Sequence, residues 1–183
     1  ITTLFGIASL FLIAIFFQSC KDVCKDVVCA NCGVCIDGVC IDDCKDIVCL
    51  NGADCCMGVC ICTEGYEGSD CSIESRIKFL GNWSFLNACY STQSPSTIAT
   101  SAVAVERVVI SNMLGTSLGG SAYALIDGAT ITIPSQTIVD TDGDSWTVEG
   151  ITVGNLMNNS FTINVKYTFG TNSETCLLTF TKQ

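Results

Sequence analysis

Cysteine spacing constrains this chain more than any other feature. Of its 15 cysteines, 13 fall between Cys20 and Cys71, whereas the rest of the chain holds only Cys89 and Cys176. A segment of that length buries too little apolar surface to fold without cross-links, so the pattern predicts a region stapled by disulfides. Disulfides persist in oxidising compartments. We therefore expect the protein to act outside the cytoplasm.

The cysteine-rich region contains an internal repeat. The segment Cys24-Lys-Asp-Val-Val-Cys29 returns 20 residues later as Cys44-Lys-Asp-Ile-Val-Cys49, so two related units stand in tandem. The second unit ends on Cys60-Ile-Cys62-Thr-Glu-Gly-Tyr-Glu-Gly-Ser-Asp-Cys71. This ending resembles that of an epidermal growth factor-like (EGF-like) module, in which C-x-C is followed by two residues, a glycine, an aromatic residue and a closing cysteine. The resemblance covers residues 44–72, and residues 20–43 resemble a truncated module that lacks the last loop.

The resemblance implies the disulfide pairing of both units. The family pattern joins the first cysteine to the third, the second to the fourth and the fifth to the sixth. It implies the pairs Cys24 with Cys35, Cys29 with Cys40, Cys44 with Cys55 or Cys56, Cys49 with Cys60, and Cys62 with Cys71. Each unit keeps one surplus cysteine, namely Cys32 and one of the Cys55–Cys56 pair, and these two can bridge the units. If Cys20 is consumed by a lipid, Cys89 and Cys176 then remain for each other.

The N-terminus indicates an export signal. Residues 1–17 carry no charge, and the first charged residue is Lys21. A transmembrane helix needs about 20 apolar residues, so a cleaved signal peptide over residues 1–19, lacking its first residues, fits better. The run Phe17-Gln-Ser-Cys20 resembles the lipoprotein signals of Bacteroidetes. That resemblance implies a lipidated (palmitate-type) Cys20 and a lipid anchor in the cell envelope, on the outer membrane or cell surface. The alternative is an uncleaved anchor helix with Cys20 as an ordinary disulfide cysteine.

Beyond a linker at residues 73–78, the apolar pattern takes a period of two. In Ser160–Phe169 every second residue is apolar, which is typical of a half-buried antiparallel strand. Similar runs lie at about 79–89, 97–104, 106–112, 121–127, 129–134, 145–153 and 174–182. Asp127-Gly128 predicts a type I′ hairpin, and a change of apolar parity across Gly150 predicts a bulge. We expect residues 79–183 to form an antiparallel eight-stranded up-and-down β-barrel, with a β-sandwich as the alternative.

Two observations predict how the barrel closes. The segment Phe79-Leu-Gly-Asn-Trp83 resembles the G-x-W first strand of lipocalin-like (calycin-like) barrels, which implies that Trp83 plugs one end beneath a basic residue of the last strand. A disulfide between Cys89 and Cys176 would join the first and last strands. Trp83 and Lys182 each lie six positions from these cysteines, on the sides that an antiparallel pair brings together. The bridge therefore predicts that Trp83 pairs with Lys182.

Composition excludes several functions. The chain has no histidine, which excludes a Ser-His-Asp triad, a Cys-His dyad and histidine-bound zinc. A net charge of −10 leaves no basic surface for nucleic acid. A hydrolase with paired carboxylates is not expected, because no two acidic residues share a predicted inner face. We thus expect no enzyme activity.

Calcium binding by acidic residues is only an alternative interpretation of two short segments. Asp42 and Asp43 precede the first cysteine of the second unit, where some EGF-like modules bind calcium, but the rest of that pattern is absent. Asp140, Asp142 and Asp144 are similar to the start of a calcium loop, yet the position of its last ligand would be Ile151. A hairpin turn explains them better. We expect no metal and no cofactor.

These observations predict a non-catalytic surface lipoprotein whose stiff modules display a β-barrel for binding. The partner would be a protein, a glycan or a small apolar ligand. The alternative is a lipocalin-like carrier with an apolar ligand inside the barrel. Because small barrels are often filled by their own side chains, the inner aromatic residues are interpreted as core. An inner cavity above about 300 Å³ would favour the carrier.

Overall fold

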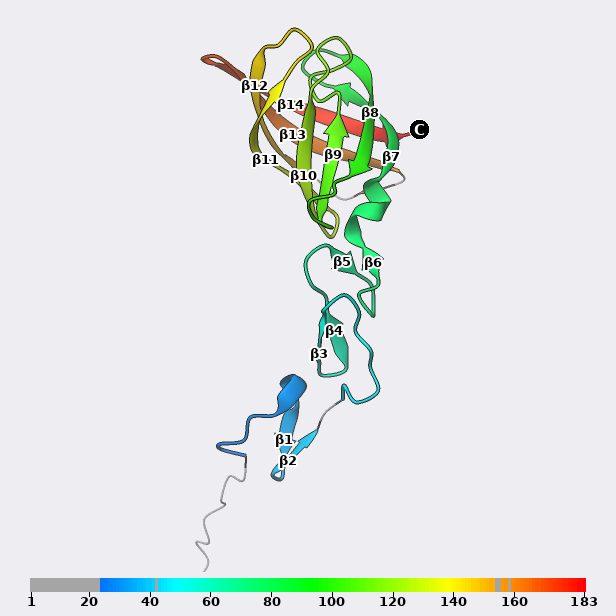
Figure 1. The fold of residues 1–183 in the computed structure, drawn as a ribbon, viewed down its shortest axis with the longest axis vertical. Coiled ribbons are helices and arrows are strands. Elements are labelled where there is room, and N and C mark those ends of the chain that lie inside the picture. The colour runs from blue at the N-terminus through cyan, green and yellow to red at the C-terminus, as the bar shows by residue number, and fades with distance from the viewer. Residues whose placement is uncertain (1–23, 42, 154–155, 158) are drawn as a thin grey trace, which may run out of the picture.

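The protein is described from a computed structural model, which covers residues 24–41, 43–153, 156–157 and 159–183. Two small modules, one after the other, lead to a barrel (Figure 1). The expected signal peptide, the lipidation site Cys20 and the acidic residue Asp42 lie outside the described residues.

Six disulfides hold the N-terminal region, and this arrangement is consistent with EGF-like modules. The first module has the 3-10 helix η1 (Ala30–Cys32) and the hairpin β1 (Val34–Ile36) and β2 (Val39–Ile41). The second has β3 (Asp54–Cys56), β4 (Val59–Ile61), β5 (Tyr66–Glu67) and β6 (Ile73–Glu74). The disulfide pairs are Cys24–Cys35, Cys29–Cys40, Cys44–Cys55, Cys49–Cys60 and Cys62–Cys71 within the modules, and Cys32–Cys56 between them.

The structure thereby resolves the choice that the sequence left open. Cys55 pairs inside its own module with Cys44, and the adjacent Cys56 reaches back to Cys32. Neighbouring residues of a strand point to opposite faces of a hairpin, so Cys55 and Cys56 form disulfides with cysteines on different sides. The bridge between Cys32 and Cys56 thus ties the two modules together.

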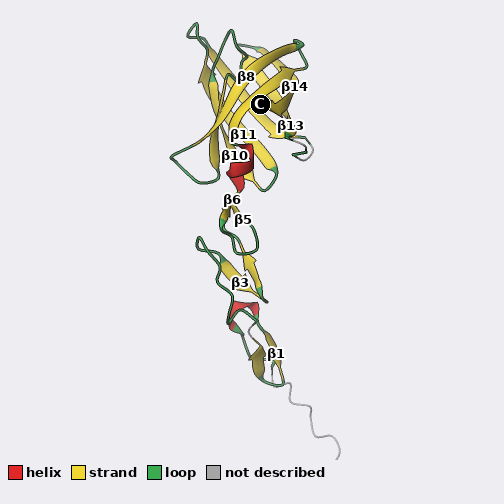
Figure 2. Ribbon diagram, turned by 90° about the vertical axis from the view of Figure 1, so that its right-hand side faces the viewer, coloured by secondary structure: helices red, strands yellow, loops and turns green. Residues whose placement is uncertain are grey.

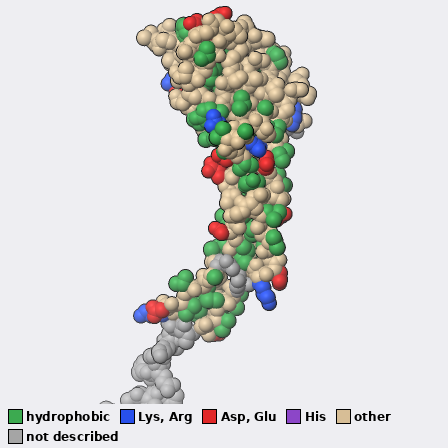
Figure 3. All heavy atoms as spheres, in the orientation of Figure 1, with side chains coloured by type: hydrophobic (Ala, Val, Ile, Leu, Met, Phe, Trp, Pro, Cys, Tyr) green, Lys and Arg blue, Asp and Glu red, His purple; other side chains and the backbone are tan. Residues whose placement is uncertain are grey.

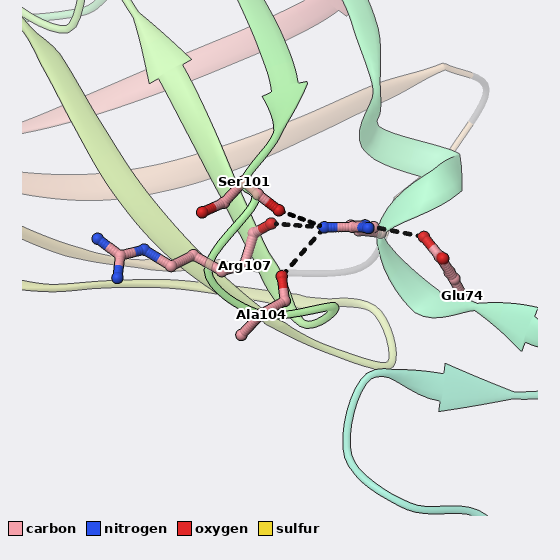
Figure 4. A network of polar contacts seen from close by, with 5 residues as sticks. Glu74, Ser101, Ala104 and Arg107 are labelled. Atoms are coloured by element: carbon pink, nitrogen blue, oxygen red, sulfur yellow. Dashed lines mark hydrogen bonds and ion pairs between the residues drawn. The ribbon is translucent and has the colours of Figure 1, made fainter. Parts of the chain in front are cut away.

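Arg76 connects the second module to the barrel. It lies in the 3-10 helix η2 (Ser75–Phe79), and its Nη1 donates to the carbonyl oxygens of Ser101, Ala104 and Arg107 at 3.1 to 3.2 Å. Its Nε also donates to Glu74 at 2.9 Å (Figure 4). Residues 73–78, interpreted from the sequence as a linker, therefore form β6 and most of η2 and are fixed to the barrel.

The predicted fold class is confirmed: eight antiparallel strands close into an up-and-down barrel, and no sandwich forms. The strands are β7 (Gly81–Asn87), β8 (Thr92–Thr100), β9 (Arg107–Ser111), β10 (Ser121–Asp127), β11 (Thr130–Val139), β12 (Ser145–Thr152), β13 (Ser160–Phe169) and β14 (Asn172–Lys182). Consecutive strands are neighbours, and β14 pairs with β7 to complete the barrel. The strands are strongly tilted, as closure requires (Figure 2).

Three local predictions differ from the structure. The second strand spans Thr92–Thr100 rather than 97–104, because Pro95 pairs with Ser84 while the chain after Thr100 turns. The turn after β10 consists of Gly128 and Ala129, with a positive φ at Gly128 alone, which a type II′ turn requires. The bulge lies in β11, between Ile133 and Gln136, and not at Gly150.

The first and last strands meet in the register that the bridge predicts. Cys89 and Cys176 are joined, Phe85 pairs with Phe180, and Trp83 pairs with Lys182. Trp83 is 1% exposed, and its indole N–H donates to the carbonyl of Phe79 at 2.7 Å. The ammonium of Lys182 lies 5.3 Å from the centre of the Trp83 ring. This cluster closes the end of the barrel that faces the modules.

Candidate functional site

The opposite end of the barrel is hollow. We call it the distal end; it consists of the segments 88–91, 112–120, 140–144 and 170–171, which connect the strands away from the modules (Figure 1). A cavity of about 480 Å³ opens there. It is lined by Asn87, Tyr90, Thr92, Gln93, Ser94, Leu114, Gly115, Thr116, Ser117, Leu118, Trp146 and Tyr167.

A change in the inward-facing residues explains why this half is hollow. Along β7 the inward positions read Trp83, Phe85 and then Asn87 toward the distal end. β8 runs from the distal end toward the modules, and its inward positions in that order are Ser94, Ser96 and Ile98. The cavity therefore begins where Asn87 follows Phe85 along β7, and it is bordered by Ser94, which pairs with Phe85; Ser96 pairs with Trp83 in the filled half and does not line the cavity.

The segment 112–120 forms one wall of the cavity. Met113 is fully buried, and its carbonyl accepts a hydrogen bond from the Tyr167 hydroxyl at 2.9 Å. The Ser94 hydroxyl accepts from the Thr116 amide at 3.2 Å. Two strands on different sides of the barrel thus hold this segment. Leu114 and Leu118 face the cavity as a result.

Aromatic side chains form the other wall. The Trp146 ring stacks on Phe169 with 4.7 Å between ring centres, and its indole N–H donates to Asp140 Oδ2 at 2.9 Å. This hydrogen bond, with those from the backbone amides of the turn, holds the pKa of Asp140 below its usual value. Asp140 is therefore an anion that fixes the orientation of Trp146.

The tyrosines at the cavity are neutral. Burial raises the pKa of Tyr167 far above that of a free phenol. The Tyr90 hydroxyl donates to Glu174 Oε2 at 2.6 Å, and this hydrogen bond raises the pKa of Tyr90. Both phenols thus stay protonated at physiological pH, and the carboxylate of Glu174 is held at the rim.

A second hollow of about 240 Å³ adjoins the cavity. It is lined by Tyr90, Trp146, Tyr167, Phe169, Asn172, Ser173 and Glu174. The first three of these residues also line the larger cavity. Tyr90, Trp146 and Tyr167 therefore border both hollows, whereas Phe169 and Glu174 line only the smaller one.

Asn87 offers an unused hydrogen-bond donor to the cavity. Its side chain is 8% exposed, and its Oδ1 accepts from the Cys89 amide at 2.9 Å. Its Nδ2 has no hydrogen-bond partner among the described residues. This nitrogen is not fully enclosed by the protein, so it can donate to water or to an acceptor atom of a ligand in the cavity.

The predicted turn at Asp140, Asp142 and Asp144 is observed as a turn. Asp140 Oδ1 accepts from the backbone amides of Asp142 and Asp144, at 3.0 and 2.8 Å, so this carboxylate is used by the chain itself.

In the second module, Asp43 is exposed. Within the described ranges, one group of cysteine and acidic side chains is close enough to share a metal: Cys89, Glu174 and Cys176. Its two sulfurs are already joined in a disulfide.

Comparisons with known protein families, with curated proteins and with solved structures give no significant match for this chain. Among the described residues, no helix is long and apolar enough to cross a membrane. The function of the protein is therefore inferred from the geometry of the distal end.

The closure of the barrel near the modules was predicted from the sequence, but the cavity at the distal end was not. Trp83 and Lys182 lie at the end near the modules, away from the cavity. The interpretation of the inner aromatic residues as core holds for Phe85, Phe161 and Phe180; Tyr167, which also belongs to the core, and Trp146, which packs against it, line the cavity as well. The replacement of apolar by polar residues at inward positions was a signal that could have found the cavity.

Proposed function

We propose that this protein is a non-catalytic cell-surface lipoprotein whose EGF-like stalk displays a barrel that binds a small ligand at its distal end. The observation that carries the proposal is the cavity of about 480 Å³ at the barrel mouth. Its volume lies within the range of small-molecule sites, and its lining combines apolar walls with a few polar groups, as such sites do.

The architecture supports display. The modules are held by six disulfides, and Arg76 fixes the second module to the barrel, so the distal end points away from the modules (Figures 1 and 4). A lipid on Cys20 would hold the N-terminus at the membrane and place the cavity at the far end of the molecule.

A lipocalin-like carrier of a small apolar ligand is the second candidate. The cavity exceeds the volume of about 300 Å³ that favours a carrier. The half of the barrel near the modules is filled by Trp83, Phe85, Phe161 and Phe180, so a ligand would occupy only the mouth. An exposed site of this kind suits display and capture better than enclosure.

The anchor is tested by the substitution Cys20→Ala, expressed in a bacterial host. We expect the parent protein in the membrane fraction and the variant released from it, because no lipid can be attached. Retention of the variant in the membrane would instead support an uncleaved helix.

The cavity is tested with N-phenyl-1-naphthylamine, an uncharged probe whose fluorescence rises in apolar sites. Thr92→Trp adds a large side chain to the cavity lining, whereas Thr97→Trp adds the same side chain to an exposed position of the same strand that does not line it. We expect Thr92→Trp to weaken probe binding at least ten-fold and Thr97→Trp to leave it unchanged. Equal binding by both variants would refute a ligand site at the distal end.

A further inference from the structure

Charge is distributed unevenly along the barrel. Among the residues that the structure describes, no Lys or Arg lines either hollow at the distal end. The described basic residues from η2 onward are Arg76, Lys78, Arg107 and Lys182, which lie near the modules, and Lys166, which pairs with Glu149 at 3.0 Å. Acidic side chains gather at the distal tip, and basic ones lie lower on the barrel (Figure 3).

Four acidic residues lie at the distal end: Asp140, Asp142, Asp144 and Glu174. Their field is not balanced locally by any described basic side chain, so it disfavours an anionic ligand and attracts a cationic one. A carboxylate ligand such as a fatty acid would find no positive partner in the cavity. The charge pattern thus selects against the acidic ligands that many apolar pockets hold.

The smaller hollow has the composition of a site for an organic cation. Four aromatic rings, those of Tyr90, Trp146, Tyr167 and Phe169, line it together with one carboxylate, that of Glu174. The faces of aromatic rings are electronegative and attract cations, and quaternary ammonium groups are recognised in this way. A metal cation would instead need several oxygen ligands, for which carboxylates are usual, whereas Glu174 is the one carboxylate among the described residues that line this hollow, and one of its oxygens already accepts from Tyr90.

The surrounding contacts hold these groups in place before any ligand binds. Phe169 and Asp140 fix the Trp146 ring, and the Met113 carbonyl fixes Tyr167. Tyr90 binds one oxygen of Glu174, and Oε1 of that carboxylate has no partner among the described residues. A preorganised site of this kind loses little side-chain entropy on binding.

From this arrangement we propose that the distal end binds a small organic cation of the alkylammonium class. The ammonium head lies in the smaller hollow against the aromatic rings and Glu174. The rest of the ligand extends into the larger cavity, where Asn87 Nδ2 donates to an acceptor atom. This inference rests on the proposed function, because it names the ligand class of the same site.

The test compares two probes of the same shape. Choline carries a trimethylammonium group, and 3,3-dimethylbutan-1-ol replaces its nitrogen by carbon and has no charge. Binding is followed by Trp fluorescence and by calorimetry with the full chain. We expect choline to bind at least ten-fold more tightly than the neutral alcohol, because only choline gains from the rings and the carboxylate.

Matched variants locate the effect. Glu174→Gln removes the carboxylate charge but keeps an acceptor for Tyr90, so we expect choline affinity to fall about five- to ten-fold and the affinity for the alcohol to stay the same. Asp127→Asn removes an equal charge from an exposed turn at the other end of the barrel, and we expect no change. Melting temperatures close to the parent's show that both variants fold.

The possible results distinguish failure of the cation inference from failure of the proposed function. Equal binding of choline and the alcohol, or equal loss in Glu174→Gln and Asp127→Asn, overturns the cation inference and leaves a ligand site in place. Binding of N-phenyl-1-naphthylamine without choline binding also overturns the cation inference alone. If no probe binds and Thr92→Trp changes nothing, the proposed function fails as well.

Discussion

The disulfide between Cys89 and Cys176 provides a sharp test of how the barrel is held closed. It links the segment after β7 to β14, across a sequence separation of 87 residues, which is far larger than that of any other described bridge. We propose to remove it with Cys89→Ser, at the exposed cysteine, and Cys176→Ala, at the buried one. Both changes are made together so that no reactive thiol remains.

The expected effect follows from the length of the enclosed loop. A bridge that closes a loop of this size reduces the entropy of the unfolded chain by an amount equal to about 4–5 kcal/mol at 25 °C. For a barrel of this length, 1 kcal/mol corresponds to about 4 °C in melting temperature. The double variant should therefore melt about 15–20 °C below the parent, with β7 and β14 still paired in the folded state.

Differential scanning calorimetry measures the change, and near-ultraviolet circular dichroism checks that the Trp83 environment is kept. The control is the pair Cys32→Ser and Cys56→Ser, which removes the bridge between the modules and leaves the barrel intact. We expect its barrel transition to stay within about 3 °C of the parent's. A Cys89/Cys176 double variant that also melts within about 3 °C would refute the argument from loop entropy.

Three further predictions concern single side chains. Arg76→Ala removes a donor from three carbonyl oxygens, of which those of Ala104 and Arg107 keep a backbone donor, so it should cost about 1–3 kcal/mol of unfolding free energy and make residues 73–79 sensitive to limited proteolysis. Trp83→Phe removes the donor to Phe79 and leaves a gap, which should cost about 2 kcal/mol in chemical denaturation. Because the pKa of Asp140 is lowered in the folded state, chiefly by Trp146, its carboxylate stabilises the fold above about pH 4 and loses that contribution as pH falls through the lower folded value. The difference in melting temperature between the parent and Asp140→Asn should therefore shrink from about pH 6 toward pH 2, and a constant difference would contradict the assigned role.

The sequence by itself determined the division into a stapled region and a barrel. Cysteine clustering indicates the first, and the alternation in Ser160–Phe169 indicates the second, because both are local properties that survive without knowledge of the fold. Even the pairing of Trp83 with Lys182 follows from residue numbers once Cys89 and Cys176 are joined, because each residue lies six positions from the cysteine on its strand or just after it. Antiparallel pairing turns one fixed contact into a register for two whole strands.

Only the tertiary structure decided where the bulge lies and which half of the barrel is empty. The parity change in β12 was assigned to Gly150, but the partner strand β11 takes the extra residue near Pro134, which has no amide to give to the sheet. A bulge belongs to a pair of strands, so one strand's pattern does not say which of the two carries it.

The candidate site was decided in the same way. Tyr90, Trp146 and Tyr167 come from three separate parts of the chain, and no local pattern indicates that they line one cavity. Whether an inward-facing aromatic residue fills the core or borders a hollow depends on the residues opposite it. Here Asn87 and Ser94 border the hollow, whereas Trp83, Phe85 and Phe180 fill the half near the modules, and only closure of the barrel brings these strands face to face.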